Sequence, residues 1–431
     1  MENETGLKYL RRRKGTTVTF LFIPAFLITY LASLYYFELF TSNVFALAAI
    51  FYSVILAISI FARFPLALSY DPAKYCAVTG SEPTVTITIP VFNEEKSIVD
   101  TVNSAISVDY PPEKIQVIVV NDGSTDSTRA LLERFALGNP NRFTLINFER
   151  NQGKRAAMYE SFVRATGEII VTMDSDTVVK PNAIKEIVKP FVDSNISGVC
   201  GHVDVKGPRK LLERIQAANY FLSFHLYKKS ESAFNSVICL SGPLAAYRKD
   251  QVLPLMDEWY NQTFLGKRCT FGDDRGLTTL LLRTGKKLVY TPAALAETGC
   301  PVTFLKIWKQ RLRWKRSYYR EMFWLSKFAY KKRKAGFSVL HYSYYAMSMV
   351  SPIVSIFYLF MLPFISSSIV PTMVYLIGLA VISVLYAFYV KIYTTMPISW
   401  MIVWWLFNSF VLNWGTFYVW FTLNNTKWMT R

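Results

Sequence analysis

The chain has 431 residues, enough for about two or three domains. It is 52% hydrophobic and 16% aromatic with a mean hydropathy of +0.22, a balance that is hard to reconcile with a purely soluble protein. The formal net charge of +18 is explained by basic residues beside membrane segments, and it also suits an anionic lipid, substrate or product. The basic residues cluster next to apolar runs and no nucleic-acid-binding motif is present, so nucleic acid is not expected as a partner.

Uncharged runs lie at both ends of the chain. Residues 15–37 and 39–62 are each long enough for a helix to span roughly 30 Å of hydrocarbon. Residues 335–390 contain no Lys, Arg, Asp or Glu, which leaves room for two spans, and residues 392–426 form a further uncharged run. We therefore predict membrane regions around a soluble middle.

A basic cluster at residues 11–14 precedes the first apolar run. It could be read as the start of a signal peptide, but no small-residue cleavage site follows and a second apolar run comes at once, so we interpret it as an anchor. By the positive-inside rule the N-terminus is cytoplasmic, and two crossings make the central domain cytoplasmic too. Five cysteines without paired spacing fit this reducing compartment.

The soluble middle begins with alternating strands and helices. The composition changes from apolar to mixed between Pro65 and Pro83, and a strand is then predicted at residues 85–90. An amphipathic helix follows, and a second strand is predicted at residues 115–120. This order predicts an α/β domain with a parallel, doubly wound sheet.

Polar clusters follow the predicted strands. Because the carboxyl ends of parallel strands share one edge of a sheet, we expect a nucleotide-diphosphate cleft there. Glu94 and Asp122 are expected toward base and ribose, and Lys154 or Arg155 toward phosphate. A role in a turn and a helix cap is the alternative for the segment around Asp122. The residues at the start of this cleft are Phe92, Asn93 and Glu94.

Two carboxylates, Asp174 and Asp176, end a β-branched and apolar run that begins at residue 169. Their spacing of one residue points them the same way from a strand end, toward ribose and a metal ion. With diphosphate oxygens and water they suit Mg²⁺ or Mn²⁺. The alternative is a strand followed by a solvated turn, because short acidic motifs are common.

Four motifs together resemble the nucleotide-sugar half of a family-2, inverting glycosyltransferase with a GT-A fold. They are Val-Phe-Asn-Glu at 91–94, Asp-Gly-Ser at 122–124, Asn-Gln-Gly-Lys-Arg at 151–155 and Asp-Ser-Asp at 174–176. The resemblance implies a Rossmann-like, mostly parallel cytoplasmic domain, flanked by transmembrane and amphipathic interface helices.

The second half of the soluble region supplies a loop and two further acids. Ser241, Gly242 and Pro243 form a Gly/Pro loop that suits close approach by a sugar. Asp273 and Asp274 stand just before a predicted helix, where an N-cap explains one acid but not two. An inverting transferase needs one carboxylate to take the proton of the acceptor hydroxyl. The resemblance assigns this role to Asp274, with Asp273 as the alternative.

Residues 303–334 carry 12 Lys or Arg and one acid. Leu305, Trp308, Leu312, Tyr319 and Met322 fall at near-helical spacing, which predicts an apolar face in the headgroup layer while the cations meet anionic lipid.

A signature lies inside this basic segment. Gln310, Arg313 and Trp314 match the Q-x-x-R-W signature of processive family-2 synthases. There the arginine faces the diphosphate and the tryptophan offers a flat face to the acceptor sugar. Core packing is the alternative for Trp314.

The last eight residues resemble the W-x-T-R ending of hyaluronan synthases. If Trp428 and Arg431 close over UDP, as the resemblance implies, the tail is cytoplasmic and an even number of crossings follows the catalytic domain. Five spans with an outside C-terminus is the competing count. The segments assigned on this basis are spans near 338–364 and 370–390 and an interfacial or re-entrant segment at 398–420.

The expected organisation has five parts. They are an N-terminal membrane region (1–68), the GT-A domain (69–302), the basic interface region (303–334), a C-terminal membrane region (335–423) and the tail (424–431).

The product is predicted by resemblance alone. Residues 261–266 and 272–275 look like hyaluronan synthases, whereas chitin and chitooligosaccharide synthases typically carry Glu-Asp-Arg at the position of residues 273–275. The resemblance implies alternating transfer from UDP-GlcNAc and UDP-GlcA to a growing polysaccharide that is extruded through a multi-pass protein of the plasma membrane. The alternative is a synthase that uses UDP-GlcNAc only.

A non-enzymatic membrane protein that binds or transports polysaccharide is the alternative from a different class. A degenerate site should have lost at least one of Asp176, Asp274 and Trp314, and all three are present.

Overall fold

An eight-stranded sheet forms the centre of the region that the sequence predicts to be the GT-A domain, in the order β3-β2-β1-β4-β7-β6-β10-β5. The computed structural model describes residues 44–75, 82–140 and 142–426. The strands of this sheet are β1 (Val85–Val91), β2 (Ile115–Asn121), β3 (Phe143–Asn147), β4 (Ile169–Thr172), β5 (Thr177–Val179), β6 (Ile196–Val205), β7 (Ala245–Arg248) and β10 (Lys287–Thr298).

The sheet is parallel where the sequence predicts it to be. β1 runs parallel to β2 and β4, with Val85 opposite both Ile115 and Ile169, and β3 runs parallel to β2. β7 is antiparallel to both β4 and β6, and β5 is antiparallel to β10. The carboxyl ends of β1, β2 and β4 therefore meet at one edge, next to the reversal at β7.

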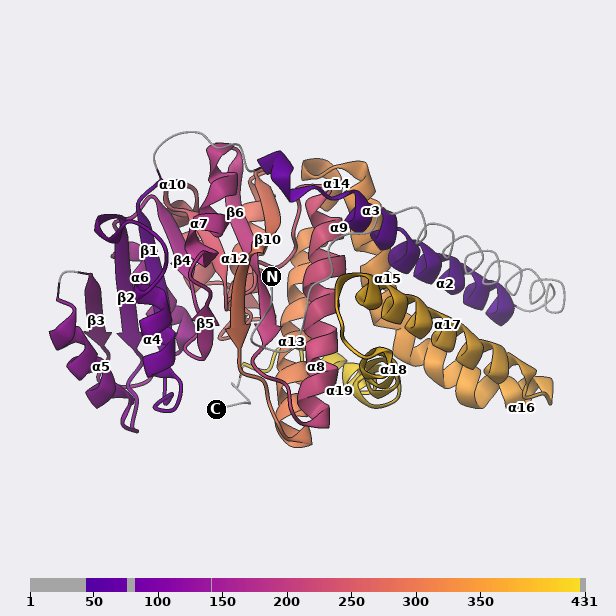
Figure 1. Ribbon diagram of the computed structural model, residues 1–431. Coiled ribbons are helices and arrows are strands. Elements are labelled where there is room, and N and C mark those ends of the chain that lie inside the picture. The colour runs from indigo at the N-terminus through magenta and orange to yellow at the C-terminus, as the bar shows by residue number, and fades with distance from the viewer. Residues whose placement is uncertain (1–43, 76–81, 141, 427–431) are drawn as a thin grey trace.

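Helices cover both faces of the sheet (Figure 1). All seven residues of β1 are buried, as expected for a parallel strand whose two faces are both covered. The helices around the sheet are α4 (Ile98–Ile106), α5 (Thr128–Gly138), α6 (Lys154–Val163), α7 (Ala183–Val188), α8 (Leu211–Leu222), α9 (Lys229–Ser232), α10 (Lys249–Val252), α11 (Met256–Tyr260) and α12 (Asp273–Arg283). A π-helical turn (Ser223–Lys228) joins α8 to α9, and a small hairpin pairs β8 (Thr263–Phe264) with β9 (Lys267–Arg268).

The predicted basic segment forms α13 (Phe304–Ser326) and the short α14 (Ala329–Lys332). Its apolar face is covered by protein to a large extent: Leu312, Tyr319 and Met322 are buried, whereas Leu305 remains 59% exposed. α13 packs on α12 and on the C-terminal helix α19 (Gly415–Trp420). The prediction that this whole face lies in the headgroup layer is therefore wrong, because the helix joins the catalytic domain to the C-terminal region.

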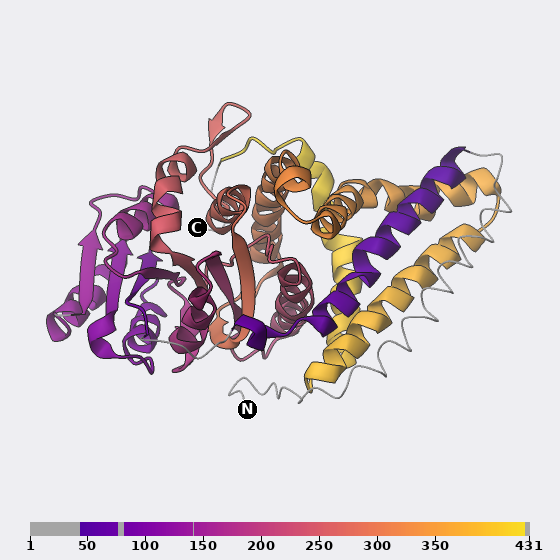
Figure 2. The ribbon, with the colours of Figure 1, turned by 90° about the horizontal axis from the view of Figure 1, so that it is seen from above.

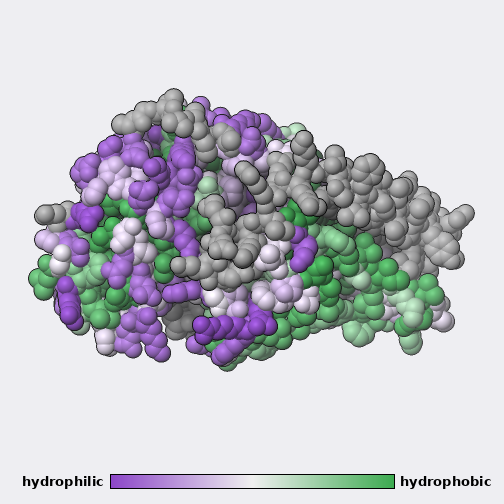
Figure 3. Space-filling model, viewed as in Figure 1, coloured by the Kyte–Doolittle hydropathy of each residue, from purple (hydrophilic) through white to green (hydrophobic). Residues whose placement is uncertain are grey.

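The long apolar helices extend away from the sheet on one side (Figures 1 and 2). They are α2 (Val44–Phe61), α15 (Ala335–Ile356), α16 (Leu362–Ser366) and α17 (Val370–Tyr393), with a π-helical turn (Phe357–Met361) between α15 and α16. Of the described residues, 335–365 and 375–393 form helices long and apolar enough to cross a membrane. A large hydrophobic area of the surface lies over the lower right of Figure 3, where α16 and α17 are found in Figure 1.

The other predicted membrane segments are the two N-terminal spans and the segment at residues 398–420, and the structure describes only part of them. The first predicted span, residues 15–37, lies outside the described residues, and α2 falls within the second. The uncharged run at 398–420 is divided into α18 (Ile398–Phe407), a π-helical turn (Asn408–Leu412) and α19, so it is not one spanning helix. The number of crossings stays a prediction.

A buried ion pair ties the first described helices to the catalytic domain. Arg63, at the start of α3 (Arg63–Ser69), donates to Ser230 over 3.1 Å and lies 3.5 Å from a carboxylate oxygen of Glu231. The side chains of Arg63 and Glu231 are 2% and 5% exposed. The guanidinium also lies over the rings of Tyr227 and Tyr344, at 4.5 and 4.8 Å.

Candidate functional site

Asp174 and Asp176 follow β4 and line one cavity of about 690 Å³. Lys154, at the start of α6, forms an ion pair with Asp174 inside this cavity. A Cβ atom on Gly242 would lie 3.3 Å from a carboxylate oxygen of Asp174 and 3.5 Å from Nζ of Lys154. The loop at residues 241–243 therefore passes close to Asp174 and Lys154, and its contact with a sugar stays a prediction.

The carboxylate of Asp176 lies in a negative environment. Thr298 donates a hydrogen bond to it over 3.1 Å. Burial, and then the charges of Asp174 and Glu94, raise the pKa of Asp176 to about 6. Such excess negative charge fits a hard divalent cation. No group of three or more metal-ligating side chains is found among the described residues, so a cation here would take its other ligands from diphosphate and water, as Mg²⁺ often does.

Asp122 holds the loop that precedes α6. Its carboxylate is buried and accepts hydrogen bonds from the backbone N–H groups of Gln152 and Gly153, at 2.6 and 3.0 Å. Gly153 has a φ of +95°, which a side chain would strain. Both oxygens of Asp122 therefore face the loop that presents Lys154, and its contact with base or ribose stays a prediction.

The segments that follow β1 and β2 are tied together. Asn93 adopts a φ of +52°, and its side-chain oxygen accepts a hydrogen bond from the backbone of Thr125 over 2.8 Å. Ser124 in turn accepts one from the backbone N–H of Asn93 over 3.0 Å. Glu94 lines the cavity, as predicted, whereas Phe92 is half-buried outside its lining.

Arg155 and Asp273 form a buried ion pair with an Nε–Oδ1 distance of 3.0 Å. Arg155 also donates to the carbonyl oxygen of Trp259 over 2.8 Å and to Gln262 over 3.1 Å. Of the two residues predicted to face phosphate, Lys154 therefore lines the cavity and Arg155 is turned toward α12. The carboxylate of Asp273 is held by Arg155, which makes it the weaker candidate for a base.

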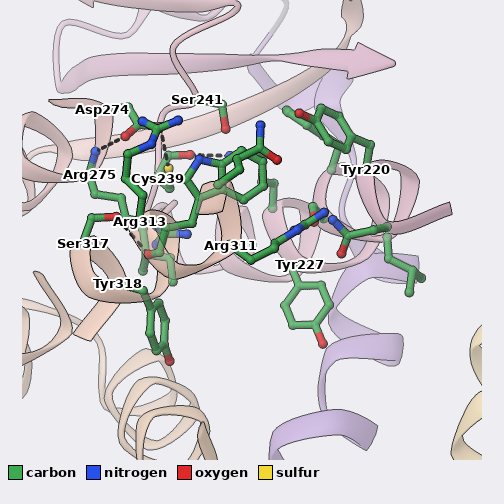
Figure 4. A pocket seen from close by; sticks show the side chains of 18 of the residues that line it. Tyr220, Tyr227, Cys239, Ser241, Asp274, Arg275, Arg311, Arg313, Ser317 and Tyr318 are labelled. Carbon is green, nitrogen blue, oxygen red and sulfur yellow. Dashed lines mark hydrogen bonds between the residues drawn. The ribbon is translucent and has the colours of Figure 1, made fainter. Parts of the chain in front are cut away.

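Asp274 faces the cavity beside the loop that carries Cys239 and Ser241 (Figure 4). Its carboxylate accepts hydrogen bonds from Cys239 Sγ at 3.3 Å and from the backbone N–H of Arg275 at 2.8 Å. Burial opposes its ionisation, but the charges of Arg275 and Lys154 and these hydrogen bonds prevail and lower the pKa of Asp274. The carboxylate is therefore ionised at neutral pH and able to accept a proton.

The side chains predicted to meet the acceptor line the same cavity: Ser241, Gly242, Pro243, Gln310, Arg313 and Trp314. The ring of Trp314 lies 6.5 Å from that of Tyr220, and it is only partly buried. The ring therefore lines the cavity, and its role as a platform for the acceptor sugar stays a prediction.

Arg311 is a cavity residue that sequence reasoning missed. Its guanidinium lies 4.7 Å from the ring of Trp314 and 4.9 Å from that of Trp404 on α18. When the side-chain amide of Asn219 has its oxygen facing Arg311, that oxygen accepts hydrogen bonds from both terminal nitrogens of the guanidinium, at 3.1 and 3.2 Å. Burial lowers the pKa of Arg311 to about 10. The one available signal in the sequence is its place inside the Q-x-x-R-W signature, at the first variable position.

Trp428 and Arg431 lie outside the described residues. The described chain ends at Thr426, whose carbonyl oxygen accepts a hydrogen bond from Thr270, three residues before Asp273. Arg316 donates to Thr422 over 2.9 Å. These contacts bring the last described residues next to the segment that leads into the site.

Comparison with known proteins identifies the domain. Residues 86–252 match the glycosyl transferase family 2 model. An N-acetylglucosaminyltransferase of Azorhizobium caulinodans is 37% identical over 243 residues, which cover 56% of this chain and 60% of that protein. A hyaluronan synthase of Streptococcus pyogenes serotype M3 is 29% identical over 313 residues, which cover 72% of each. The chain spans only 60% of the length of the N-acetylglucosaminyltransferases of Azorhizobium caulinodans and Rhizobium leguminosarum that it matches.

A solved structure supports the fold. The mannosyltransferase of Pyrobaculum calidifontis, in complex with GDP-Man and Mn²⁺, superposes with a TM-score of 0.53 at 18% identity, covering 83% of this chain and 99% of its own. Residues 86–252 therefore match a family-2 glycosyltransferase domain, the sheet and its helices have the GT-A fold, and the chain is similar to hyaluronan synthases and N-acetylglucosaminyltransferases.

Proposed function

We propose that the protein is a membrane-integrated, processive polysaccharide synthase that transfers N-acetylglucosamine from UDP-GlcNAc and passes the growing chain between its own helices. One observation carries the proposal: a single cavity contains the acidic pair, Asp274 and Trp314, and it continues between the long helices. A one-step transferase has no need of such a continuation.

In the proposed reaction Asp274 takes the proton of an acceptor hydroxyl while that oxygen attacks the anomeric carbon of the donor sugar. The new glycosidic bond forms as the bond to UDP breaks, with inversion at the anomeric carbon. Lys154 and Arg313 are placed to offset charge on the departing diphosphate. A Mg²⁺ or Mn²⁺ ion held by Asp174 and Asp176 would neutralise the same charge.

Processive transfer requires that the polymer end stays bound after each step. Trp314 is carried by α13 and faces the cavity, so one helix holds both the arginine of the Q-x-x-R-W signature and the platform for the acceptor sugar. The proposed role of the tail, with Trp428 and Arg431 over UDP, is supported by the contact between Thr270 and Thr426.

A hyaluronan synthase that adds GlcNAc and GlcA alternately is the second candidate. It is favoured by the Asp273-Asp274-Arg275 motif and by the similarity to the hyaluronan synthase of Streptococcus pyogenes over 72% of the chain.

The proposed setting is a plasma membrane, with the catalytic domain in the cytoplasm. The hydrophobic surface over the long helices supports it (Figure 3). The exposed lysines Lys331 and Lys332 end α14, a few residues before α15 begins, which suits contact with anionic lipid at the membrane surface.

The test is transfer of radiolabelled sugar by the purified protein, given each UDP-sugar alone and then both, with Mg²⁺ or Mn²⁺. The expected result is labelled polymer from reactions that contain UDP-GlcNAc, and none from an Asp274→Asn control. A protein that binds UDP-sugars or polysaccharide but forms no polymer under any condition would be a binder or transporter instead.

A further inference from the structure

Glu321 is the one acid beside 12 Lys or Arg in residues 303–334, and the proposed reaction does not use it. Its side chain is only 4% exposed although it belongs to the strongly basic helix α13. Burying a carboxylate is costly unless hydrogen-bond donors satisfy it. The burial of Glu321 must therefore be offset by specific partners.

Two donors from different parts of the chain satisfy this carboxylate. Arg320 donates from Nε to Oε1 of Glu321 over 2.8 Å. The side-chain amide of Gln262, which follows α11, donates to Oε1 and Oε2 over 3.3 and 3.5 Å. Gln262 in turn accepts a hydrogen bond from Arg155 over 3.1 Å, and Arg155 is paired with Asp273. One neutral amide thus joins the ion pair between α6 and α12 to the ion pair on α13, and we call this amide the Gln262 bridge.

α13 approaches the start of α12 too closely for any side chain at Gly272. A Cβ atom there would lie 2.4 Å from Cβ of Ser317 and 2.7 Å from Nη2 of Arg320. Arg320 also donates to the carbonyl oxygen of Phe271 over 2.7 Å. Arg320 therefore holds the segment that leads directly into Asp274, the proposed base.

The face of α13 that carries Glu321 also carries the proposed acceptor platform. Trp314 and Ser317 lie seven and four residues before Glu321, about two turns and one turn of an α-helix, so the three side chains share one side of α13. Trp314 and Ser317 line the cavity, whereas Glu321 and Gln262 lie outside its lining. The distance between the platform and the base therefore depends on how α13 is fixed to α12.

We infer that Glu321 and Gln262 are positioning residues of the transfer step, which together fix the acceptor platform on α13 at the correct distance from the base on α12. The inference rests on the proposed function, because it takes Trp314 as the platform and Asp274 as the base. A water molecule moves freely to the donor sugar, but a polymer end held by Trp314 moves with α13. Loss of the Gln262 bridge should therefore favour hydrolysis of UDP-GlcNAc over transfer.

The experiment measures sugar incorporated into polymer and UDP released in the same reaction, with the full-length protein and labelled UDP-GlcNAc. Transfer incorporates as much sugar as it releases UDP, whereas hydrolysis releases UDP without incorporation. Gln262→Met removes the bridge and keeps every charge, and Glu321→Gln removes the carboxylate that holds Arg320. Thermal unfolding of each protein is measured in parallel.

A double variant, Gln262→Glu with Glu321→Gln, exchanges the two types of side chain. The introduced carboxylate would accept from Arg155, and the introduced amide would donate to that carboxylate and accept from Arg320. The hydrogen bonds and the total charge of the group are thereby kept.

Glu258→Gln is the matched control. Glu258 also pairs with an arginine, Arg283 at the end of α12, but the two side chains are 52% and 43% exposed. An exposed ion pair contributes little to stability. The control should therefore keep the native ratio of incorporated sugar to released UDP.

The expected result is a fall in this ratio of about 10-fold or more in both single variants, because a misplacement of about 1 Å can reduce the rate of a reaction by about 10²-fold. The double variant should return toward the native ratio. If Glu321→Gln protein does not fold, Gln262→Met decides the outcome, since it keeps both ion pairs.

A native ratio in either single variant, whatever its Tm, would overturn the inference, because the residue would then only stabilise the fold. A double variant that misfolds or keeps the low ratio would overturn it as well. Absence of polymer from native protein that still binds UDP would instead refute the proposed function, and the inference with it.

Discussion

Asp273 and Asp274 are adjacent at the start of α12, and replacing each by asparagine is expected to cause a different defect in the protein. Asp273 is bonded to Arg155 over 3.0 Å in a pair whose side chains are 6% and 5% exposed, so solvent does not screen the interaction. Removing one partner of such a buried pair costs about 3 to 5 kcal/mol, because the other charge stays buried. For a domain of this size that corresponds to a fall of about 10 °C in Tm.

Asp274→Asn should remove turnover and lower Tm less than Asp273→Asn does, because Asp274 lines the cavity, although Arg275 and Lys154 lose a nearby negative charge. The carboxylate faces the cavity, and Cys239 and the backbone of Arg275 donate to it. Loss of a general base reduces kcat by about 10²-fold or more, which is about 2.7 kcal/mol in the barrier. UDP-sugar binding should stay near that of the native protein.

The assay pairs thermal unfolding in detergent with UDP release and UDP-sugar binding, for both variants and the native protein. Asp273→Asn protein should melt early yet turn over at low temperature, whereas Asp274→Asn protein should melt closer to the native protein and be inactive. The reasoning is refuted if Asp273→Asn keeps its Tm and loses turnover while Asp274→Asn stays active, since the two roles would then be exchanged.

Three further outcomes are expected at the cavity. Asp176→Asn should abolish both transfer and UDP-sugar hydrolysis because charge on the diphosphate is left uncompensated, and full activity in that variant or in excess chelator would contradict the metal site. Trp314→Ala should shorten the polymer more than it slows UDP release. The reason is that the polymer end loses about 1 to 3 kcal/mol of stacking free energy, by analogy with bases on aromatic rings. Trp314→Phe is the matched control, and it should keep most of the polymer length. Normal product length from Trp314→Ala would show that the ring merely packs the helix. Gly242→Ala should raise the KM for donor, because its Cβ would lie 3.3 Å from the carboxylate of Asp174 and 3.5 Å from Lys154, and an unchanged KM would show that the loop shifts freely.

Much of the catalytic region is predictable from the sequence because its signals are local. Unbroken apolar runs identify the buried parallel strands, and side chains placed just after β1 and β4 must lie on one edge of the sheet. That is why Glu94, Asp174 and Asp176 are found in one cavity as predicted.

Contacts made at long range are not predictable in this way. The pairing of Arg155 with Asp273 joins residues 118 positions apart, and neither side chain carries a local sign that it faces inward. The helical spacing of Leu312, Tyr319 and Met322 likewise predicts an apolar face but not what covers it, and the structure covers it with protein rather than lipid.

The ion pair between Arg63 and Glu231 has a consequence for folding during synthesis of the chain. The two residues are 168 positions apart, and at common rates of synthesis Glu231 is made roughly 10 to 30 s after Arg63. During that interval the arginine that follows α2 has no buried carboxylate to meet, and its charge must remain hydrated. The contact that fixes α2 and α3 to the central sheet can therefore form only after most of that sheet has been translated.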